Sequence, residues 1–425
     1  MDTYLEDGAA ALTAAQWESL HGTGRADRSQ GYARFREHME PGTPLLLTAA
    51  DAAGRCAALH GTLTTPASGL FSHPWKLLTA EQMLRPEENG GEQARADHAE
   101  LLRAVVGTGS GAGGGSGEGG GAGERPDAAA LTAVLGEAIV FRGFDSTEAG
   151  LRTGLDGATR HQALLALLEG ARDAVRAGTA GAVCLPFVRE DDEPLRTALG
   201  ELGFRSAVLT AVSDFDLTGV SSYEEYVAAL PSRRRRTYRK EEQAMADSAL
   251  RIDTWPLAGH VAQVAALEAR NVAKYGGRPD PEVLIAARSA MAELLGHQVR
   301  VAVAVRPDGG PAAGEPAACG IHMADDHSYC ILMYGADDTV ADGGPAYPCL
   351  TFYEPLRYAA DHGLATVRLG FEAFSAKLRR GARLSRRETW IWTPDGDRLA
   401  ALHRVMEFLA ARTATHFEHL IGHAA

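Results

Sequence analysis

The sequence predicts an α/β protein with mixed sheets flanked by helices, and three observations support this class. Short apolar runs of strand length alternate with longer segments whose apolar residues recur at helical spacing. The order of these elements is similar in the two halves of the chain, which indicates two tandem domains. A chain of 425 residues is long enough for two domains of ordinary size.

The first half contains five apolar runs that fit strands and two segments that fit helices. The strands are predicted at 44–50, 55–60, 137–142, 181–187 and 207–215. The helices are predicted at 157–178 and 193–202, and Gly203 is a suitable residue to end the second one. The glycine-rich stretch 107–123 cannot build a core, so we expect it to be a flexible, disordered insert.

The second half of the chain shows a similar alternation of predicted strands and helices. Strands are predicted at 251–255, 299–305, 317–323, 328–334, 366–370 and 388–392. Helices are predicted at 222–247, 259–275, 281–295, 350–362, 373–380 and 397–420. Pro231 interrupts the first of these helices, at a place that suits the start of a new one. Gly363 is expected to end the helix at 350–362.

The order helix, helix, three strands, helix, strand, helix, strand is that of the acetyltransferase-like (GNAT) fold. Both halves of the chain approximate it. The predicted fold class is therefore α/β, with mixed α+β sheets in tandem GNAT-like domains. We place the first domain at 1–215, with the glycine-rich insert inside it, and a second, catalytic domain at 216–425.

Composition limits the classes of function. The formal net charge of −13 argues against a protein that coats nucleic acid, although a local basic patch remains compatible with it. No apolar run reaches the roughly 18 residues of a membrane span, and the acidic start has no secretory pattern. A cytoplasmic location is therefore predicted. The five cysteines are scattered and form no C-x-x-C pair, so we predict small buried hydrophobes, with no metal site and no cofactor.

One segment is strongly basic, although the chain as a whole is acidic. Residues 231–240 contain six cations in ten residues. Like charges three or four residues apart destabilise a helix by roughly 0.2–0.5 kcal/mol per pair. Arg235 with Arg239 is such a pair. An anionic ligand or the chain's own acids should offset the repulsion, and Glu241 and Glu242 can offset part of it. The alternative is a basic surface helix exposed to solvent.

Three segments of the second half resemble FemAB-like proteins. Residues 230–241 are similar to a helix of the form L-x-x-x-x-R-x-x-x-R-R-E, and the motif at 271–276 recurs in that group. Residues 369–383 resemble its G-x-x-x-x-x-x-K-x-x-x-G element. The chain most resembles the bacterial peptidoglycan biosynthesis or recognition group. Those proteins are tandem GNAT-fold relatives of the aminoacyl-tRNA-dependent transferases that build peptidoglycan bridges.

The resemblance implies amide formation, in which an acyl or aminoacyl group passes from an activated ester or thioester to an amine. The conserved lysine of the family falls on Lys377. Such a reaction needs a held, unprotonated amine and donors where the oxyanion develops. Lys377 is our candidate for an oxyanion or phosphate contact, Glu372 for holding the ammonium or taking its proton, and Tyr334 for proton donation. Each has a structural alternative, and Glu268 and Asp337 are weaker candidates for a base.

Several further residues are candidates for substrate binding, because arginine forks suit phosphates and aromatic rings can line a cleft. They are Arg233, Arg235, Arg236, Arg239, Lys274, Tyr275, Tyr347, Tyr353, Arg380 and Arg383. In the first half, His73 lies in an aromatic loop that could line a pocket, although a lone histidine is more often structural.

The donor is the main open question. Acetyl-CoA users of the GNAT class carry a pyrophosphate loop of the form R/Q-x-x-G-x-G/A before the central helix. Residues 338–349 occupy that place and contain Asp342 and two prolines, which disfavour an anion. This departure favours aminoacyl-tRNA as the donor, with an amine of a small metabolite or a peptidoglycan precursor as the acceptor. The alternatives are an acyl-CoA-dependent N-acyltransferase and a non-catalytic recognition protein on the same scaffold.

Overall fold

The computed structural model describes residues 1–85, 91–107, 125–306, 314–337, 339 and 345–424. The predicted glycine-rich insert lies outside the described residues apart from Gly107, and so does most of the segment 338–344. Contacts divide the chain into two compact units, which are interleaved along the sequence. The first unit comprises Met1–Gly22, Glu40–Ala211 and Arg386–His423, and the second comprises Thr23–Met39 and Val212–Ser385. The prediction of two tandem domains divided near residue 216 was based on the repeated order of elements along the sequence. It stays a prediction.

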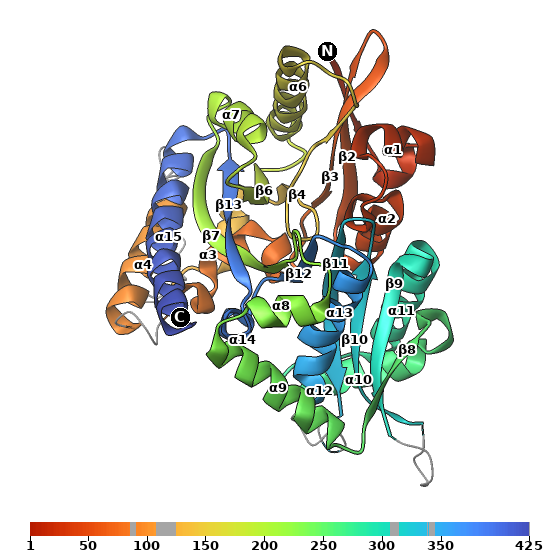
Figure 1. Ribbon diagram of the computed structural model, residues 1–425. Coiled ribbons are helices and arrows are strands. Elements are labelled where there is room, and N and C mark those ends of the chain that lie inside the picture. The colour runs from red at the N-terminus through yellow and green to blue at the C-terminus, as the bar shows by residue number, and fades with distance from the viewer. Residues whose placement is uncertain (86–90, 108–124, 307–313, 338, 340–344, 425) are drawn as a thin grey trace. The chain divides into compact units, whose positions relative to one another are not determined.

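The first unit is a sheet covered by helices (Figure 1). Its strands are β1 (Asp2–Glu6), β2 (Thr43–Asp51), β3 (Gly54–Leu63), β4 (Ala138–Phe141), β5 (Gly150–Leu151) and β6 (Ala182–Arg189). Its helices are α1 (Ala14–His21), α3 (Pro74–Thr79), α4 (Gly91–Gly107), α5 (Ala128–Leu135), α6 (Gly157–Arg176), α7 (Glu193–Glu201) and α15 (Gly396–Ala424). The strand order is β1-β2-β3-β4-β6, and β5 pairs with β3. Short 3-10 helices lie at Ala9–Ala11, Leu70–Ser72 and Glu81–Leu84.

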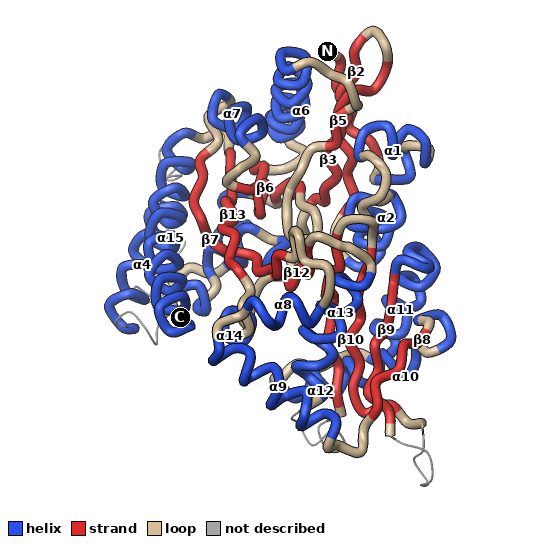
Figure 2. The backbone as a smooth tube through the Cα atoms, in the orientation of Figure 1, coloured by secondary structure: helices blue, strands red, loops and turns tan. Residues whose placement is uncertain are grey.

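The second unit is also a sheet covered by helices. Its strands are β8 (Arg251–Trp255), β9 (Val299–Val305), β10 (Pro316–Ala324), β11 (Ser328–Ala336) and β12 (Thr366–Gly370), in the order β12-β11-β10-β9-β8. Its helices are α2 (Gln30–Met39), α8 (Tyr223–Ala229), α9 (Ser232–Ala246), α10 (Val261–Lys274), α11 (Pro281–Leu295), α12 (Ala346–Pro348), α13 (Glu354–Asp361) and α14 (Phe374–Arg379). Short 3-10 helices lie at Ala26–Arg28, Leu257–Gly259 and Gly296–Gln298. Figure 2 shows these strands in red beside α10 and α13 in blue.

Each half of the sequence gives its last strand to the other unit. Strand β7 (Arg205–Asp216) follows the elements of the first unit, yet its residues 213–216 pair with β12 of the second unit. Strand β13 (Arg383–Trp392) follows the elements of the second unit, yet its residues 387–392 pair with β6 of the first. Because register and pairing are long-range properties, nothing in the local sequence pattern predicted this exchange.

The elements predicted from periodicity are present. The hairpin of β10 and β11, the helix break at Pro231 and the long closing helix are confirmed. The predicted helix at 350–362 begins earlier, at Ala346, and passes through a π-helical turn at Cys349–Tyr353. Pro355 favours the π-helical turn, because it has no N–H for an α-type bond to the carbonyl of Thr351. Elements before residue 44 and α3–α5 had not been predicted.

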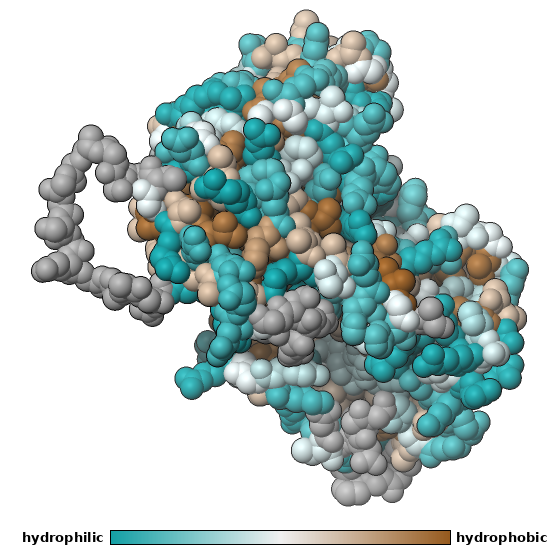
Figure 3. Space-filling model, turned by 90° about the vertical axis from the view of Figure 1, so that its left-hand side faces the viewer, coloured by the Kyte–Doolittle hydropathy of each residue, from teal (hydrophilic) through white to brown (hydrophobic). Residues whose placement is uncertain are grey.

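Apolar cores account for the buried side chains of each unit. In the second unit, one core gathers residues of α8, α9 and α13 against β7, β11 and β12. All five cysteines are buried and free. This confirms the prediction that they serve as small buried hydrophobic residues. Hydrophilic side chains predominate on the face drawn in Figure 3. None of the described helices is long and apolar enough to cross a membrane, and the described residues contain no group of three or more side chains suited to a metal ion.

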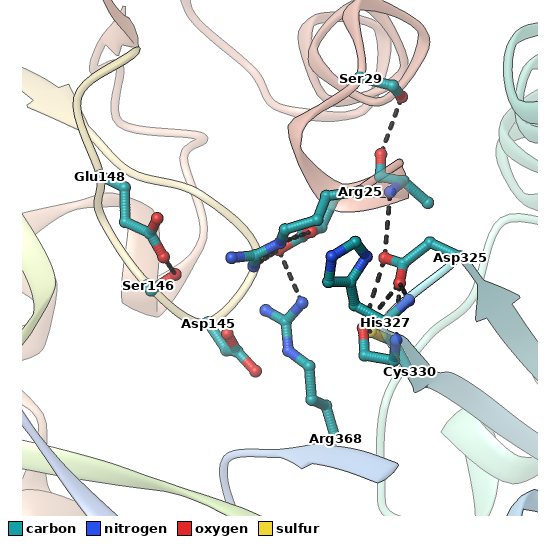
Figure 4. Close-up of polar contacts among 12 residues, drawn as sticks. Arg25, Ser29, Asp145, Ser146, Glu148, Asp325, His327, Cys330 and Arg368 are labelled. Carbon is teal, nitrogen blue, oxygen red and sulfur yellow. Dashed lines mark hydrogen bonds and ion pairs between the residues drawn. The ribbon is translucent and has the colours of Figure 1, made fainter. Parts of the chain in front are cut away.

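Ion pairs and a hydrogen bond hold the segment 23–39 to the rest of the second unit. The Asp27 carboxylate lies between two guanidiniums, accepting from Arg25 Nη2 at 2.8 Å and from Arg368 Nη1 at 2.7 Å. The backbone N–H of Ala26 donates to Asp325 Oδ2 at 3.0 Å. Figure 4 shows Arg25, Asp325 and Arg368 converging on this place. Burial raises the pKa of Asp27, but Arg368 and Arg25 outweigh it and hold that pKa at about 2.

Asp27→Asn should destabilise the second unit by about 3–5 kcal/mol, because it leaves two arginines without their buried counter-charge. The folded pKa of Asp27 lies below its ordinary value of 3.8, so its contribution is present above that pH and is lost as the pH falls toward 2. Urea unfolding between pH 7 and pH 3 measures both effects. Asp326→Asn, which changes an exposed carboxylate in the neighbouring turn, is the control. Equal stability of the two variants would contradict the expectation.

Candidate functional site

The second unit has an opening between two parallel strands. β11 and β12 pair over three residues only, the last pair being Cys330 with Arg368. Beyond Cys330, β11 continues to Ala336 and pairs with β10 alone. A strand that pairs on one side leaves alternate backbone N–H and C=O groups without a sheet partner on the other. In the described part of the chain this edge of β11 therefore offers backbone donors in the middle of a sheet.

A β-bulge redirects the side chains along this edge. Ile331 pairs with His322 and Met333 pairs with Ile321, so Leu332 is an extra residue on β11. Without the bulge, Tyr334 would point away from the face that Ile331 occupies, because side chains alternate along a strand. With it, both side chains pack against the same apolar core. The bulge thus places the predicted proton donor Tyr334 on the α13 side of the sheet.

The opposite face of β11 is closely approached by α10. A Cβ added at Gly335 would lie 2.7 Å from the backbone nitrogen of Glu268, so glycine is required for this contact. Glu268 itself accepts two hydrogen bonds from Arg288, at 2.8 and 2.7 Å, and both side chains are buried. Asp337 accepts from Arg270 and from Thr339. These two weaker candidates for a base are therefore engaged in ion pairs.

The π-helical turn places aromatic rings beside the opening. The N–H of Glu354 bonds to the carbonyl of Cys349, five residues back. Such turns occur mostly as single insertions and are frequent at functional sites. The Tyr347 ring contacts Tyr334 edge-on, with ring centroids 5.0 Å apart, and contacts Phe352 at 5.7 Å. Burial raises the pKa of Tyr347. The structure therefore brings together Tyr334 and Tyr347, which sequence reasoning had singled out separately.

The carboxylate of Glu241, a residue of α9, joins the π-helical turn to the end of α14. Glu241 receives two hydrogen bonds from Arg380, from Nε at 3.1 Å and from Nη2 at 2.7 Å, and one from the Tyr353 hydroxyl. The Arg380 guanidinium also lies 4.6 Å from the Phe352 ring. Tyr238, fully buried, donates to the carbonyl of Arg380 at 2.8 Å. Burial and the bond to Glu241 both raise the pKa of Tyr353, so it stays a neutral phenol.

These contacts fix which face of α9 meets solvent. Glu242, on the inner side like Glu241, binds Arg357 and accepts from the Tyr223 hydroxyl at 2.9 Å. Arg235 turns back and donates to the carbonyls of Ala228 and Leu230, at 3.0 and 2.6 Å. Arg235 thus caps the end of α8, and a contact with substrate stays only a prediction.

Four cations of α9 are left on the outer face. They are Arg233, Arg236, Arg239 and Lys240. All four are exposed, and within the described residues their side chains make no hydrogen bond or ion pair. The spacing of 233, 236 and 240 puts three of them on one line over two turns, a length of about 10 Å. We refer to this set as the α9 cation face.

The loop after β12 has an unusual backbone. Gly370, Glu372 and Ala373 all have left-handed φ angles, of 67°, 68° and 46°. Left-handed backbone costs roughly 1–2 kcal/mol for a residue with a Cβ. The buried Lys377 donates from Nζ to the carbonyls of Leu369, Gly370 and Phe371, at 2.7, 3.1 and 3.2 Å. Burial lowers the pKa of Lys377 to about 8, and the nearby Glu372 carboxylate opposes that shift.

Three remaining candidates, Lys274, Tyr275 and Arg383, lie at the end of α10 and at the start of β13. Tyr275 is 78% exposed at the end of α10, and Lys274 lies 5.7 Å from its ring. Arg383 is largely exposed and is paired with Asp216. Sequence reasoning missed Leu332, Gly335 and Glu241 as parts of the site, because bulges and close approaches have no local signal.

The first unit also contains two parallel strands that pair over a short length, and a side chain of the same unit fills the gap beyond their pairing. β4 and β6 pair in parallel over three residues, from Ala138 with Ala182 to Val140 with Cys184. The Thr147 hydroxyl then bonds to Phe141 at the end of β4 and to Pro186 on β6. His73 is buried, with Nε2 3.7 Å from Glu137, and burial lowers its pKa. These two hydrogen bonds of Thr147 bridge the gap between β4 and β6.

The chain was compared with known proteins. No family model and no curated protein matches it. A structure of FemX is 10% identical, with a TM-score of 0.56 over 92% of this chain and 97% of that chain. A tandem GNAT protein from the clavulanic acid biosynthesis pathway is 13% identical, with a TM-score of 0.47 over 92% and 98% of the two chains. The C-terminal domain of a candidate lysylphosphatidylglycerol synthetase from Agrobacterium fabrum is 11% identical, with a TM-score of 0.49 over 92% and 94%.

The likeness to FemX shows that this chain has the fold of FemX. It confirms the predicted class, a mixed α/β protein of the GNAT type, and the fold that the FemAB-like resemblance implied.

Glu241→Gln should destabilise the second unit by about 1.5–3 kcal/mol, the usual range for a hydrogen bond to a charged group. Glu242→Gln is the matched variant and should cost less, because its partner Arg357 is 36% exposed whereas Arg380 is 10% exposed. Chemical denaturation of the two variants beside the unaltered protein gives the comparison. A larger loss for Glu242→Gln would contradict this ranking.

Proposed function

We propose that the protein is an amide-forming N-acyl or aminoacyl transferase, and that the opening between β11 and β12 is its active site. One observation carries the proposal. A strand opening, a β-bulge, a π-helical turn and a left-handed loop occur at the same end of one sheet. Each irregularity costs stability, and such features gather at functional sites. The fold of FemX agrees with this class of reaction but does not establish it.

The donor that fits best is an aminoacyl-tRNA. The α9 cation face is exposed, three of its four cations lie on one line about 10 Å long, and none of the four side chains is paired within the described residues. Such a row suits successive phosphates along a polynucleotide backbone better than one compact diphosphate. The overall charge of −13 favours a local basic patch such as this face over nucleic-acid binding across the whole surface. The acceptor is an amine of a small metabolite or of a peptidoglycan precursor.

The proposed chemistry needs no covalent enzyme intermediate. The nitrogen of the acceptor amine attacks the ester carbonyl of the donor, and the developing oxyanion is met by backbone N–H groups on the edge of β11 that faces the opening. When the tetrahedral intermediate collapses, the C–O bond to the ribose breaks. The proton lost by the amine is passed to the leaving oxygen, with the Tyr334 hydroxyl as the proposed relay. Glu372 holds the amine, and Tyr275 and Tyr347 border the acceptor.

The direct test is incubation of the protein with charged tRNA and a panel of amines, with mass spectrometry of the products. We expect amide formation that stops when ribonuclease is added, because the tRNA ester is the activated group. Turnover that survives ribonuclease and requires an acyl-CoA would instead identify the runner-up, an acyl-CoA N-acyltransferase. Binding of tRNA without any product would indicate the non-catalytic alternative.

Arg236→Ala combined with Arg239→Ala should weaken tRNA binding uniformly across sequences. The slope of log K against log salt should fall by roughly 0.7–0.9 for each phosphate contact removed. Filter binding at several salt concentrations measures this slope. The matched control is Arg160→Ala with Arg404→Ala, two exposed helix arginines of the first unit. If the α9 variant and the control keep the same slope, the α9 cation face is only a solvated surface.

A further inference from the structure

The backbone of residues 370–373 needs something to hold it. Glu372 and Ala373 have left-handed φ angles of 68° and 46°, directly after Gly370 at 67° and Phe371. Among the described residues, no other two non-glycine positions with positive φ are adjacent. Side chains with a Cβ disfavour this region, so the conformation persists only where the surroundings impose it. The loop ends the strand that forms one side of the opening.

One amino group makes the contacts that can impose it. Lys377 Nζ donates to three successive carbonyls, those of Leu369, Gly370 and Phe371, at 2.7–3.2 Å. Ser213 Oγ adds a bond of 3.0 Å to the carbonyl of Gly370. An ammonium has three N–H donors and no more. All the hydrogen-bonding capacity of Lys377 is therefore spent on the loop itself.

The side chain that the loop presents is Glu372. It is exposed, and it lies two residues beyond the end of β12, on the side where β11 and β12 no longer pair. Its carboxylate is near enough to Lys377 to favour the charged form of that amine. A carboxylate held at the end of such an opening is suited to bind an ammonium group.

We propose that Lys377 is a positioning residue: it fixes the left-handed loop so that Glu372 holds the acceptor amine at the end of the β11–β12 opening. The part of this inference that concerns the acceptor rests on the proposed function. It differs from a direct contact of Lys377 with an oxyanion or a phosphate, which would need a free N–H. An arginine cannot replace this lysine, because a planar guanidinium does not direct three donors from one atom.

The first test needs no activity. In the unaltered protein, Ala373→Gly should raise the melting temperature, because glycine adopts a left-handed φ without strain. In Lys377→Met the loop is free to relax, so the same glycine substitution should bring no gain. This double-mutant cycle measures the coupling between the two positions. An equal effect of Ala373→Gly in both backgrounds would overturn the proposal that Lys377 holds the loop.

Lys377→Arg covers the case in which Lys377→Met does not fold. It keeps the charge and most of the length of the side chain. We expect it to lose the coupling to Ala373→Gly, because geometry and not charge holds the loop. Full coupling in Lys377→Arg would overturn the proposal. Arg379→Met, on the same short helix but exposed and bonded only to the carbonyl of Ser375, is the matched control and should keep the coupling.

The second test uses the tRNA and amine pair that gives turnover in the assay above. Lys377→Arg should raise KM for the amine roughly tenfold or more, the effect expected for one charged hydrogen bond, with little change in kcat. Glu372→Gln should do the same, and the double variant should be no worse than either single one. A fall in kcat at unchanged KM would show direct action on the oxyanion and would overturn the inference.

The two tests separate the two proposals. If no pair of donor and amine gives turnover, the proposed function fails, while the melting-temperature cycle still decides whether Lys377 holds the loop. If the cycle shows no coupling but turnover is found, the function stands and the positioning role falls.

Discussion

The ion pair between Glu241 and Arg380 is the constraint on which the site of the second unit depends. It joins α9 to α14, and through the Tyr353 hydroxyl it also reaches the π-helical turn. Because Arg380 is nearly buried, its charge needs this carboxylate close by. The same pair determines the rotation of α9 about its axis. The inner face of α9, the end of α14 and the π-helical turn are therefore joined through one carboxylate.

Periodicity predicted the elements of the second half well, and the run of positive charge predicted an anion-binding surface on α9, which stays a prediction. The choice among its arginines was beyond sequence reasoning. Arg235 and Arg236 are neighbours of the same type, yet one caps α8 and the other is exposed without a partner. Which of them points inward depends on where Tyr238 and Glu241 are buried, and that is a property of tertiary packing. For the same reason the three carbonyl partners of Lys377 could not be foreseen, and its role in the site stays a prediction.

The comparison of the units gives a physical reason to look for chemistry in the second one. In each, two parallel strands pair over three residues and then part. In the first unit, the Thr147 hydroxyl fills the gap by bonding to both strands. In the second unit, the bulge at Leu332 and the left-handed loop lie beside the opening between β11 and β12. Backbone groups that are paired internally cannot serve a substrate, whereas those along β11 can.

An acidic protein keeps a cationic face only if its nearest acids are occupied elsewhere. The run of cations in α9 is followed at once by two glutamates, which could have folded back to neutralise it. Instead Glu241 binds Arg380 and Glu242 binds Arg357, residues more than a hundred positions away. The acids closest in sequence thus stabilise the tertiary structure and leave the outer cations unpaired. Local repulsion among those cations is retained, and an anionic partner that relieves it gains the corresponding free energy on binding.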